Sequence, residues 1–156
     1  MTRLPALMLA GVLVLGGCSA GFWESDPTRP IALDPVLAGD LRIDRIEVRS
    51  TFYNPPDAFS DAFIPGFRRA TDTCFAGSRA VRAIVFIHAL DRSSPLVDAD
   101  GRLRLPGRVE LRDHRDHVLA RYTVGVDMPG PDGDLAHRRT AAAEAFGRSL
   151  CDQAGG

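Results

Sequence analysis

Residues 81–90 are Val-Arg-Ala-Ile-Val-Phe-Ile-His-Ala-Leu, and apolar side chains occupy both alternating sets of positions. A strand with apolar residues on both faces is typical of the middle of a sheet, where neighbouring layers bury it. The segment therefore predicts a central strand. We interpret His88 as a histidine that packs on a sheet face, and the other predicted elements are placed around this strand.

Two strands of alternating pattern follow the central one. Apolar residues alternate with charged ones from Leu103 to Leu111 and again from Val118 to Val126. Alternation puts the apolar side chains on one face of a sheet. The pattern predicts an antiparallel hairpin with one buried face and one solvent-facing face. Pro106 has no backbone N–H, so it favours an edge position or a bulge in the first of these strands.

One further strand is predicted before the central one, beginning at Leu41 and ending at Phe52. Its apolar alternation slips by one residue between Ile43 and Ile46. A slip of this kind indicates an extra residue in the strand, so we expect a β-bulge there.

Two helices are predicted, near residues 57–74 and 135–152, from apolar side chains at helical spacing. The Pro65-Gly66 pair predicts a kink or a split in the first helix, and Asp134 is a suitable N-cap for the second. The apolar stripes are Phe59, Phe63, Phe67, Ala70 and Cys74 in the first helix, and Leu135, Ala142, Phe146 and Leu150 in the second.

The predicted element order is β-α-β-β-β-α, in one domain that covers residues 40–154. Both helical stripes are buried if the helices pack on one face of a mainly antiparallel sheet. The predicted fold class is therefore α+β, as a two-layer sandwich.

Residues 1–17 have the three parts of an export signal. Arg3 precedes an apolar run from Leu7 to Leu15, and Gly16 and Gly17 follow it. The run is shorter than the roughly 20 residues that a membrane-spanning helix needs. We expect residues 1–17 to be a signal peptide.

The sequence Leu15-Gly16-Gly17-Cys18 resembles the bacterial lipobox, in which the thiol is acylated and the preceding peptide bond is cut. The resemblance implies a lipoprotein that is attached to a membrane through Cys18, with residues 18–39 as a flexible, proline-containing tether. It also implies a periplasm-facing place in the bacterial cell envelope. Ser19 favours the outer over the inner membrane in the lipoproteins that the segment resembles. The alternative is an ordinary signal peptide that is cut near a cysteine.

Cys74 and Cys151 remain once Cys18 is assigned to lipid. An even number of cysteines in an oxidising compartment predicts a disulfide. It would join the ends of the two predicted helices. The alternative is a pair of buried thiols, since cysteine is often buried.

No motif for catalysis or cofactor binding is present. The chain has no Gly-x-Ser-x-Gly and no glycine-rich phosphate loop. Its formal net charge is −1, so it has no strong field to attract nucleic acid. We therefore expect no catalytic residue, no cofactor and no nucleic-acid partner.

Residues 113–117, Asp-His-Arg-Asp-His, carry the weak metal-ligand candidates Asp113, His114, Asp116 and His117. Imidazoles and carboxylates bind zinc or copper. A closed site usually takes ligands from a second element, which the sequence does not indicate. We interpret the segment as a polar hairpin tip and expect no tight metal site.

The element order, the tether and two segments together resemble small Gram-negative envelope lipoproteins. The segments are Val109–Asp113 and Val118–Ala120, which resemble the strand-turn-strand segment of ABC-transport auxiliary lipoproteins and of TolB N-terminal-like domains. The resemblance covers about residues 40–153. It implies the fold and the location, and it carries no activity.

The leading functional hypothesis is a non-enzymatic adaptor or accessory subunit of an envelope complex, with a sheet face or edge as its binding surface. The alternative is a lipoprotein that binds a small ligand or a metal, at the 113–117 turn or in a cleft between sheet and helices.

Overall fold

The computed structural model describes residues 28–50, 57–88 and 97–155. The signal peptide, Cys18 and the first part of the expected tether lie outside the described residues. The elements are α1 (Pro35–Ala38), β1 (Leu41–Ser50), α2 (Asp57–Thr71), β2 (Arg79–Ile87), β3 (Arg102–Arg112), β4 (Val118–Pro129) and α3 (Leu135–Ala154).

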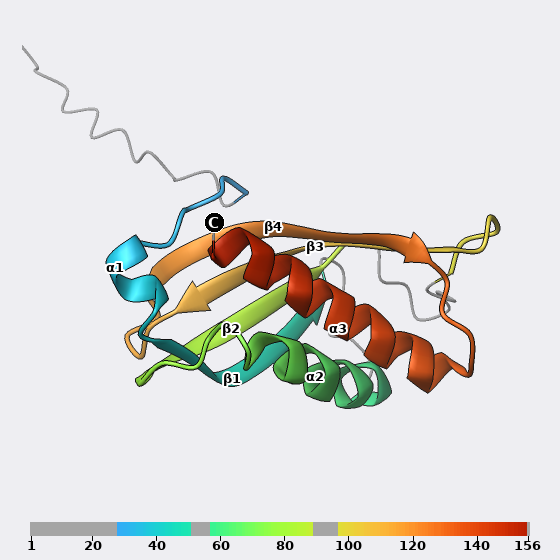
Figure 1. Ribbon diagram of the computed structural model, residues 1–156, viewed down its shortest axis with the longest axis horizontal. Coiled ribbons are helices and arrows are strands. Elements are labelled where there is room, and N and C mark those ends of the chain that lie inside the picture. The colour runs from blue at the N-terminus through green and yellow to red at the C-terminus, as the bar shows by residue number, and fades with distance from the viewer. Residues whose placement is uncertain (1–27, 51–56, 89–96, 156) are drawn as a thin grey trace, which may run out of the picture.

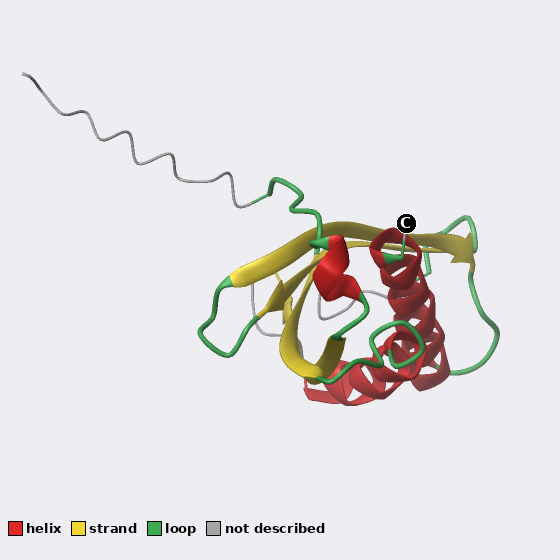
Figure 2. Cartoon of the chain, turned by 60° about the vertical axis from the view of Figure 1, so that its left-hand side comes forward, coloured by secondary structure: helices red, strands yellow, loops and turns green. Residues whose placement is uncertain are grey.

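The four strands form one sheet in the order β1-β2-β3-β4. β1 and β2 are parallel, whereas β2 with β3 and β3 with β4 are antiparallel. Both long helices lie on the same side of the sheet (Figures 1 and 2). The predicted α+β two-layer fold is confirmed, and β2 is the internal strand that its two-sided apolar pattern predicts.

Two local irregularities follow from single residues. The register of β1 against β2 shifts between Ile43 and Arg45, which confirms the predicted bulge. Pro106 lies in β3, an internal strand, where proline is unusual. The expected edge position is therefore wrong. Pro106 lies opposite the end of β2, which finishes at Ile87, and the N–H of His88 donates to the Pro106 carbonyl (2.9 Å).

The core lies between the sheet and the helices, where aromatic rings meet close-packed glycines. Phe146 of α3 is fully buried and contacts Phe63 and Phe67 of α2, with ring centroids 5.9 and 6.3 Å away. A Cβ at Gly107 would lie 2.8 Å from the Phe146 ring, and one at Gly147 would lie 2.7 Å from the Ala70 side chain. Gly107 is therefore needed for close approach of the sheet and α3, and Gly147 for close approach of the two helices.

α2 is a single helix from Asp57 to Thr71 with Pro65 inside it. Of the two outcomes expected at Pro65-Gly66, a kink or a split, the split is wrong. The missing N–H of Pro65 faces the carbonyl of Asp61 one turn earlier. Both residues are exposed, so water can bond that carbonyl and the helix continues.

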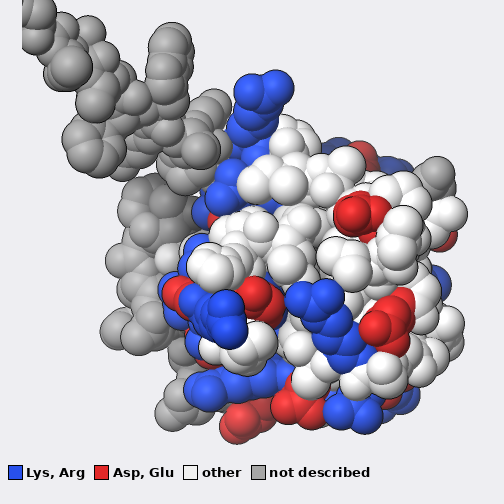
Figure 3. Space-filling view, turned by 90° about the vertical axis from the view of Figure 1, so that its left-hand side faces the viewer, with Lys and Arg blue, Asp and Glu red and all other residues white. Residues whose placement is uncertain are grey.

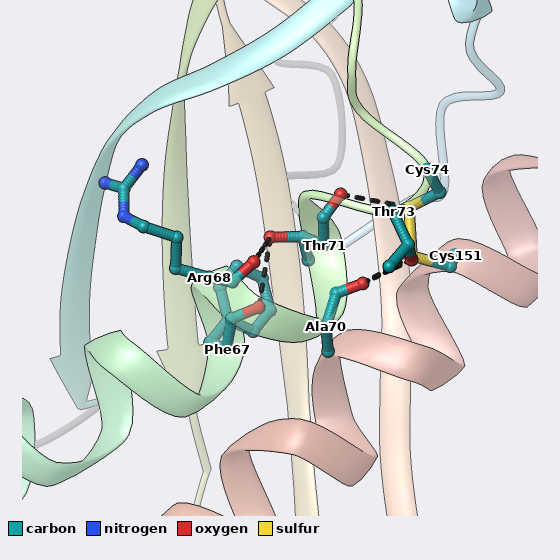
Figure 4. Close-up of a disulfide and its surroundings, with 7 residues drawn as sticks. All are labelled: Phe67, Arg68, Ala70, Thr71, Thr73, Cys74 and Cys151. Atoms are coloured by element: carbon teal, nitrogen blue, oxygen red, sulfur yellow. Dashed lines mark hydrogen bonds between the residues drawn. A yellow bond between two sulfur atoms is a disulfide. The ribbon is translucent and has the colours of Figure 1, made fainter.

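A disulfide joins Cys74, just after α2, to Cys151 in the last turns of α3 (Figure 4). The two Cα atoms are 5.7 Å apart, within the usual range for a disulfide. The bond fixes the C-terminal ends of the two helices to each other, and the predicted pairing is confirmed.

Residues 28–39 contact the folded domain, although the sequence analysis assigned them to the tether. Ile31 forms a two-way backbone bridge to Arg121 of β4, and Leu33 is buried. Asp34 caps the short helix α1 by accepting from the Val36 N–H (2.9 Å). The first described residues therefore run along one edge of the sheet before β1 begins.

None of the helices in the described ranges is long and apolar enough to cross a membrane.

Candidate functional site

The side of the sheet that faces away from α2 and α3 carries a connected set of charged side chains. Alternation along each strand sends them to this side, while their apolar neighbours enter the core. We call this surface the charged face, and it consists of Arg45, Glu47 and Arg49 from β1, Arg82 and Phe86 from β2, Arg108, Glu110 and Arg112 from β3, and Arg121 from β4.

Glu110 lies at the centre of the charged face and is only 2% exposed. Its carboxylate accepts hydrogen bonds from the Nε of Arg121 (2.9 Å) and the Nε of Arg112 (3.0 Å), and the Nε of Arg108 lies 3.6 Å away. Burial raises the pKa of Glu110, but the hydrogen bonds from Arg112 and Arg121 outweigh it and hold the pKa below its usual value. Glu110 is therefore ionised at neutral pH.

The network extends from Glu110 across the sheet towards β1. Arg82 pairs with Glu47 on β1 (3.3 Å) and with Asp116 in the β3–β4 turn. Arg112 also reaches Asp116 (3.2 Å). Arg121 adds a link to the first described residues, since its Nη1 donates to the carbonyl of Arg29 (3.1 Å). Ion pairs thus connect all four strands.

The guanidinium of Arg108 stacks on the aromatic ring of Phe86. Its guanidinium carbon lies 4.4 Å from the centroid of the Phe86 ring on the neighbouring strand, a distance at which cation–π attraction operates. This stacking restrains the Arg108 guanidinium against the sheet.

Three of the four weak metal candidates, Asp113, Asp116 and His117, form contacts within or beside the β3–β4 turn. Asp113 accepts from the backbone N–H groups of Arg115 (2.8 Å) and His117 (2.9 Å), and the His117 ring lies 3.3 Å from the Asp113 carboxylate. Asp116 adopts φ of 69°. These contacts hold Asp113 and Asp116 in the turn.

The pKa values of the two turn carboxyls reflect these contacts. Desolvation raises the pKa of Asp113, but the hydrogen bonds from the backbone N–H groups of His117 and Arg115 lower it by more. The pKa of Asp113 therefore lies below its usual value. Asp116 behaves in the same way, with Arg112 and Arg82 as the opposing groups. In the described part of the chain no three histidine, cysteine, aspartate or glutamate side chains gather in a way that could hold a metal ion.

A shallow hollow of about 390 Å³ lies beside the turn, at the β1 bulge. It is lined by Asp44, Arg45, Arg82, Asp113, His114 and Asp116, with Ala80 and Val81. His114 is thus in the hollow, whereas its partner candidate His117 is not among the lining residues. The hollow is a polar, solvent-open depression that could receive one charged or polar group.

Sequence reasoning did not find the cluster around Glu110. Its residues occupy outward positions of alternating strands, and the same pattern also describes a solvated surface. The sequence does place Glu110 between Arg108 and Arg112 at alternate positions, and this pattern could have indicated an ion-pair cluster. Figure 3 shows basic and acidic side chains interspersed on the end of the molecule that is at the left in Figure 1, without a field of a single sign.

Comparisons with known proteins place this chain by shape only. No family model matches the sequence, and no curated protein matches it. Similar solved structures include two PelC dodecamers from Paraburkholderia phytofirmans, each with a TM-score of 0.41, 78% of this chain and 94% of that chain covered, and identities of 16% and 15%. Protein XCC0632 from Xanthomonas campestris, with the family name DUF330, has a TM-score of 0.39 and 12% identity, with 78% of this chain and 87% of that chain covered.

The resemblance to ABC-transport auxiliary lipoproteins and TolB-like domains is not shown by any of these three structures. At this level of identity and TM-score the function of this chain has to be argued from its own residues.

Proposed function

We propose that this chain is a lipid-anchored protein of the bacterial envelope that works as a non-enzymatic adaptor and presents its charged face to a protein partner. One observation carries the proposal: a sheet face that no described helix covers bears charged side chains held in place by mutual ion pairs. Preorganised side chains lose little entropy on binding. A surface fixed in this way is therefore suited to recognition.

The charge of the face indicates the kind of partner. It carries the six arginines 45, 49, 82, 108, 112 and 121 against Glu47, Glu110 and Asp116, the acid of the β3–β4 turn that pairs with Arg82 and Arg112. The face is positive although the whole chain is close to neutral. Opposite charge speeds encounter and sets orientation. The matching partner surface is acidic.

The anchor is the second part of the proposal. Cys18 carries the lipid, the signal peptide is removed before it, and the domain faces the periplasm, preferably from the outer membrane. The lipobox resemblance supports this part. Replacing Cys18 by serine should move the protein from the membrane fraction to the soluble fraction, and mass spectrometry of the N-terminal peptide of the wild type should show an acylated Cys18. An unmodified Cys18 would remove the anchor from the proposal.

The adaptor role is tested with a photo-cross-linking amino acid in the full-length protein in intact cells. Position 49 is on the charged face, and position 148, on the outer side of α3, is the matched control, since both arginines are exposed and each makes one surface ion pair. We expect an adduct with one defined protein at position 49 and none at position 148. Equal labelling at both positions, or none at 49, would contradict the adaptor role.

A small-ligand function is the second candidate, because the hollow at the β1 bulge brings Arg45, Arg82 and His114 around one depression. It predicts that a small polar solute protects His114 from chemical modification in the purified protein. The adaptor proposal does not require such protection.

A further inference from the structure

The outer edge of β4 is already used for strand pairing by this chain. The N–H of Ile31 donates to the carbonyl of Arg121 (2.9 Å), and the N–H of Arg121 donates to the carbonyl of Ile31 (2.8 Å). Alternate residues of a strand direct their backbone groups to the same side. Thr123, Gly125 and Asp127 therefore direct theirs to this same edge.

The second half of the edge has no strand beside it in the described part of the chain. Among residues 28–50, 57–88 and 97–155, none forms a backbone hydrogen bond to Thr123, Gly125 or Asp127 outside the β4 ladder. Figure 1 shows β4 as the outermost strand, with the segment before α1 beside its beginning only. Three pairs of main-chain donors and acceptors are thus available to a further strand.

The opposite edge of the sheet is blocked, which makes β4 distinctive. β1 is interrupted by the bulge at Asp44, and Arg68 of α2 donates to the carbonyls of Ile43 (3.2 Å) and Asp44 (3.0 Å). Bulges and covering side chains are the usual ways in which proteins prevent edge pairing. β4 has neither device between Thr123 and Asp127.

This chain's own N-terminal segment is a poor occupant for the open half. The described chain bends at Thr28 and Arg29, away from a continued strand. In the register set by Ile31 and Arg121, continued pairing would put Pro27 opposite Gly125, and proline has no N–H to donate.

A second copy of β4 is also a poor occupant. A two-fold pairing centred on Gly125 would bring Pro129 of the copy opposite Arg121. Ile31 already occupies that position. In this register a second copy is excluded, and we take a segment of a different polypeptide as the occupant.

We propose that the outer edge of β4 from Thr123 to Asp127 binds an extended segment of the partner protein as an added β-strand. The inference rests on the proposed adaptor function and specifies how the partner binds. Main-chain hydrogen bonds then supply affinity, and pockets for alternate side chains supply specificity.

The surroundings define the side chains of this segment. A hollow of about 300 Å³ at the Thr123 end is lined mainly by apolar surface, with Ile31, Tyr122 and Thr123 among its residues, and it receives an apolar side chain. A Cβ at Gly125 would have no atom within 4 Å, so a large side chain can lie over that residue. The fitting segment has an apolar residue and a bulky residue two positions apart.

The test uses the full-length protein in intact cells, with the photo-cross-linking amino acid at position 125. Thr123→Pro removes one outward N–H and leaves the bonds between β3 and β4 intact, while Thr123→Val keeps that N–H and serves as the matched control. We expect an adduct with another protein that Thr123→Pro reduces roughly tenfold, the effect of about one hydrogen bond, and that Thr123→Val leaves unchanged. An adduct that is insensitive to Thr123→Pro, an adduct with a second copy, or no adduct would overturn the proposal.

Hydrogen exchange gives a second measurement in case Thr123→Pro does not fold. It uses the protein with the photo-cross-linking amino acid at position 49 and an unchanged β4 edge, compared alone and as the purified cross-linked complex. The amides of Thr123, Gly125 and Asp127 should exchange at least about tenfold more slowly in the complex than in the protein alone. Equal rates would overturn the added strand. If adducts form at position 49 while the three amides stay unprotected, the adaptor function survives and the edge proposal fails.

Discussion

The two faces of the sheet are formed by alternate residues of the same strands, yet different interactions stabilise them. The face under the helices is apolar and close-packed, with Phe146 over Gly107 and a disulfide at its end. The charged face consists of arginines and carboxylates that bond one another. Packing energy is large and depends on shape, whereas exposed ion pairs contribute little. The fold therefore depends on the first face, and the second can be adapted for binding.

The largest expected effect comes from replacing one phenylalanine by alanine on each face of the sheet and comparing the losses of stability. Phe146→Ala should lower the free energy of unfolding by about 3–5 kcal/mol, because it empties the space between the helices and Gly107. Phe86→Ala, on the charged face, is the matched control and should cost clearly less, since Phe86 is partly exposed. Chemical denaturation measures both. A loss for Phe86→Ala as large as that for Phe146→Ala would contradict the comparison.

The disulfide is the next largest contribution on the helix side. Replacing Cys74 and Cys151 together by alanine should lower the free energy of unfolding by about 2–4 kcal/mol, mainly through the larger entropy of the unfolded chain. Reductant should destabilise the wild type by a similar amount and leave the double variant unaffected. A reductant effect that persists in the double variant would show that something other than this bond is being measured.

Glu110 tests whether the charged face contributes to stability at all. Glu110→Gln should lower the free energy of unfolding by about 1–3 kcal/mol at pH 7, since it removes the charge shared by Arg112 and Arg121. The pKa of Glu110 is lower in the folded protein than its ordinary value of 4.5. The stabilisation is therefore complete above about pH 4.5 and is lost as the pH falls through the folded-state pKa.

The measurement is the difference in unfolding free energy between wild type and Glu110→Gln across the acid range. It should be constant from pH 7 to about pH 5 and shrink below that. A difference that grows as the pH falls would mean that Glu110 is destabilised as an anion, and would contradict its place at the centre of the network.

The smallest effect is expected at the turn. His114→Ala combined with His117→Ala should change the free energy of unfolding by less than about 0.5 kcal/mol, because both side chains are exposed. Calorimetric titration of the purified protein with zinc should show only weak binding. Stoichiometric binding that survives dialysis and is lost in the double variant would make metal handling the leading function.

The sequence predicted the fold because each element has a periodicity that only one arrangement satisfies. The two-sided apolar pattern at 81–90 defined the internal strand, and the slip after Ile43 located the bulge. Pro65 was misjudged because its effect depends on the solvent exposure of Asp61, which is a tertiary property. Residues 28–39 were misjudged because a single backbone bridge at Ile31 has no side-chain pattern.

The candidate site was harder to predict than the fold. An outward arginine has the same sequence signal whether it is hydrated or bonded to a buried carboxylate. The difference at Glu110 arises from Arg121 on the next strand, eleven residues away, and from the register that brings them together. The edge of β4 was equally hidden, because strand order decides which strand is outermost.

The bridge between Ile31 and Arg121 also has a mechanical consequence. A pull on the N-terminus is transmitted first to this bridge and to the contact of Arg121 with the Arg29 carbonyl. These bonds precede the buried Leu33 and the helix α1 along the chain, so they carry the load before the core and β1 do.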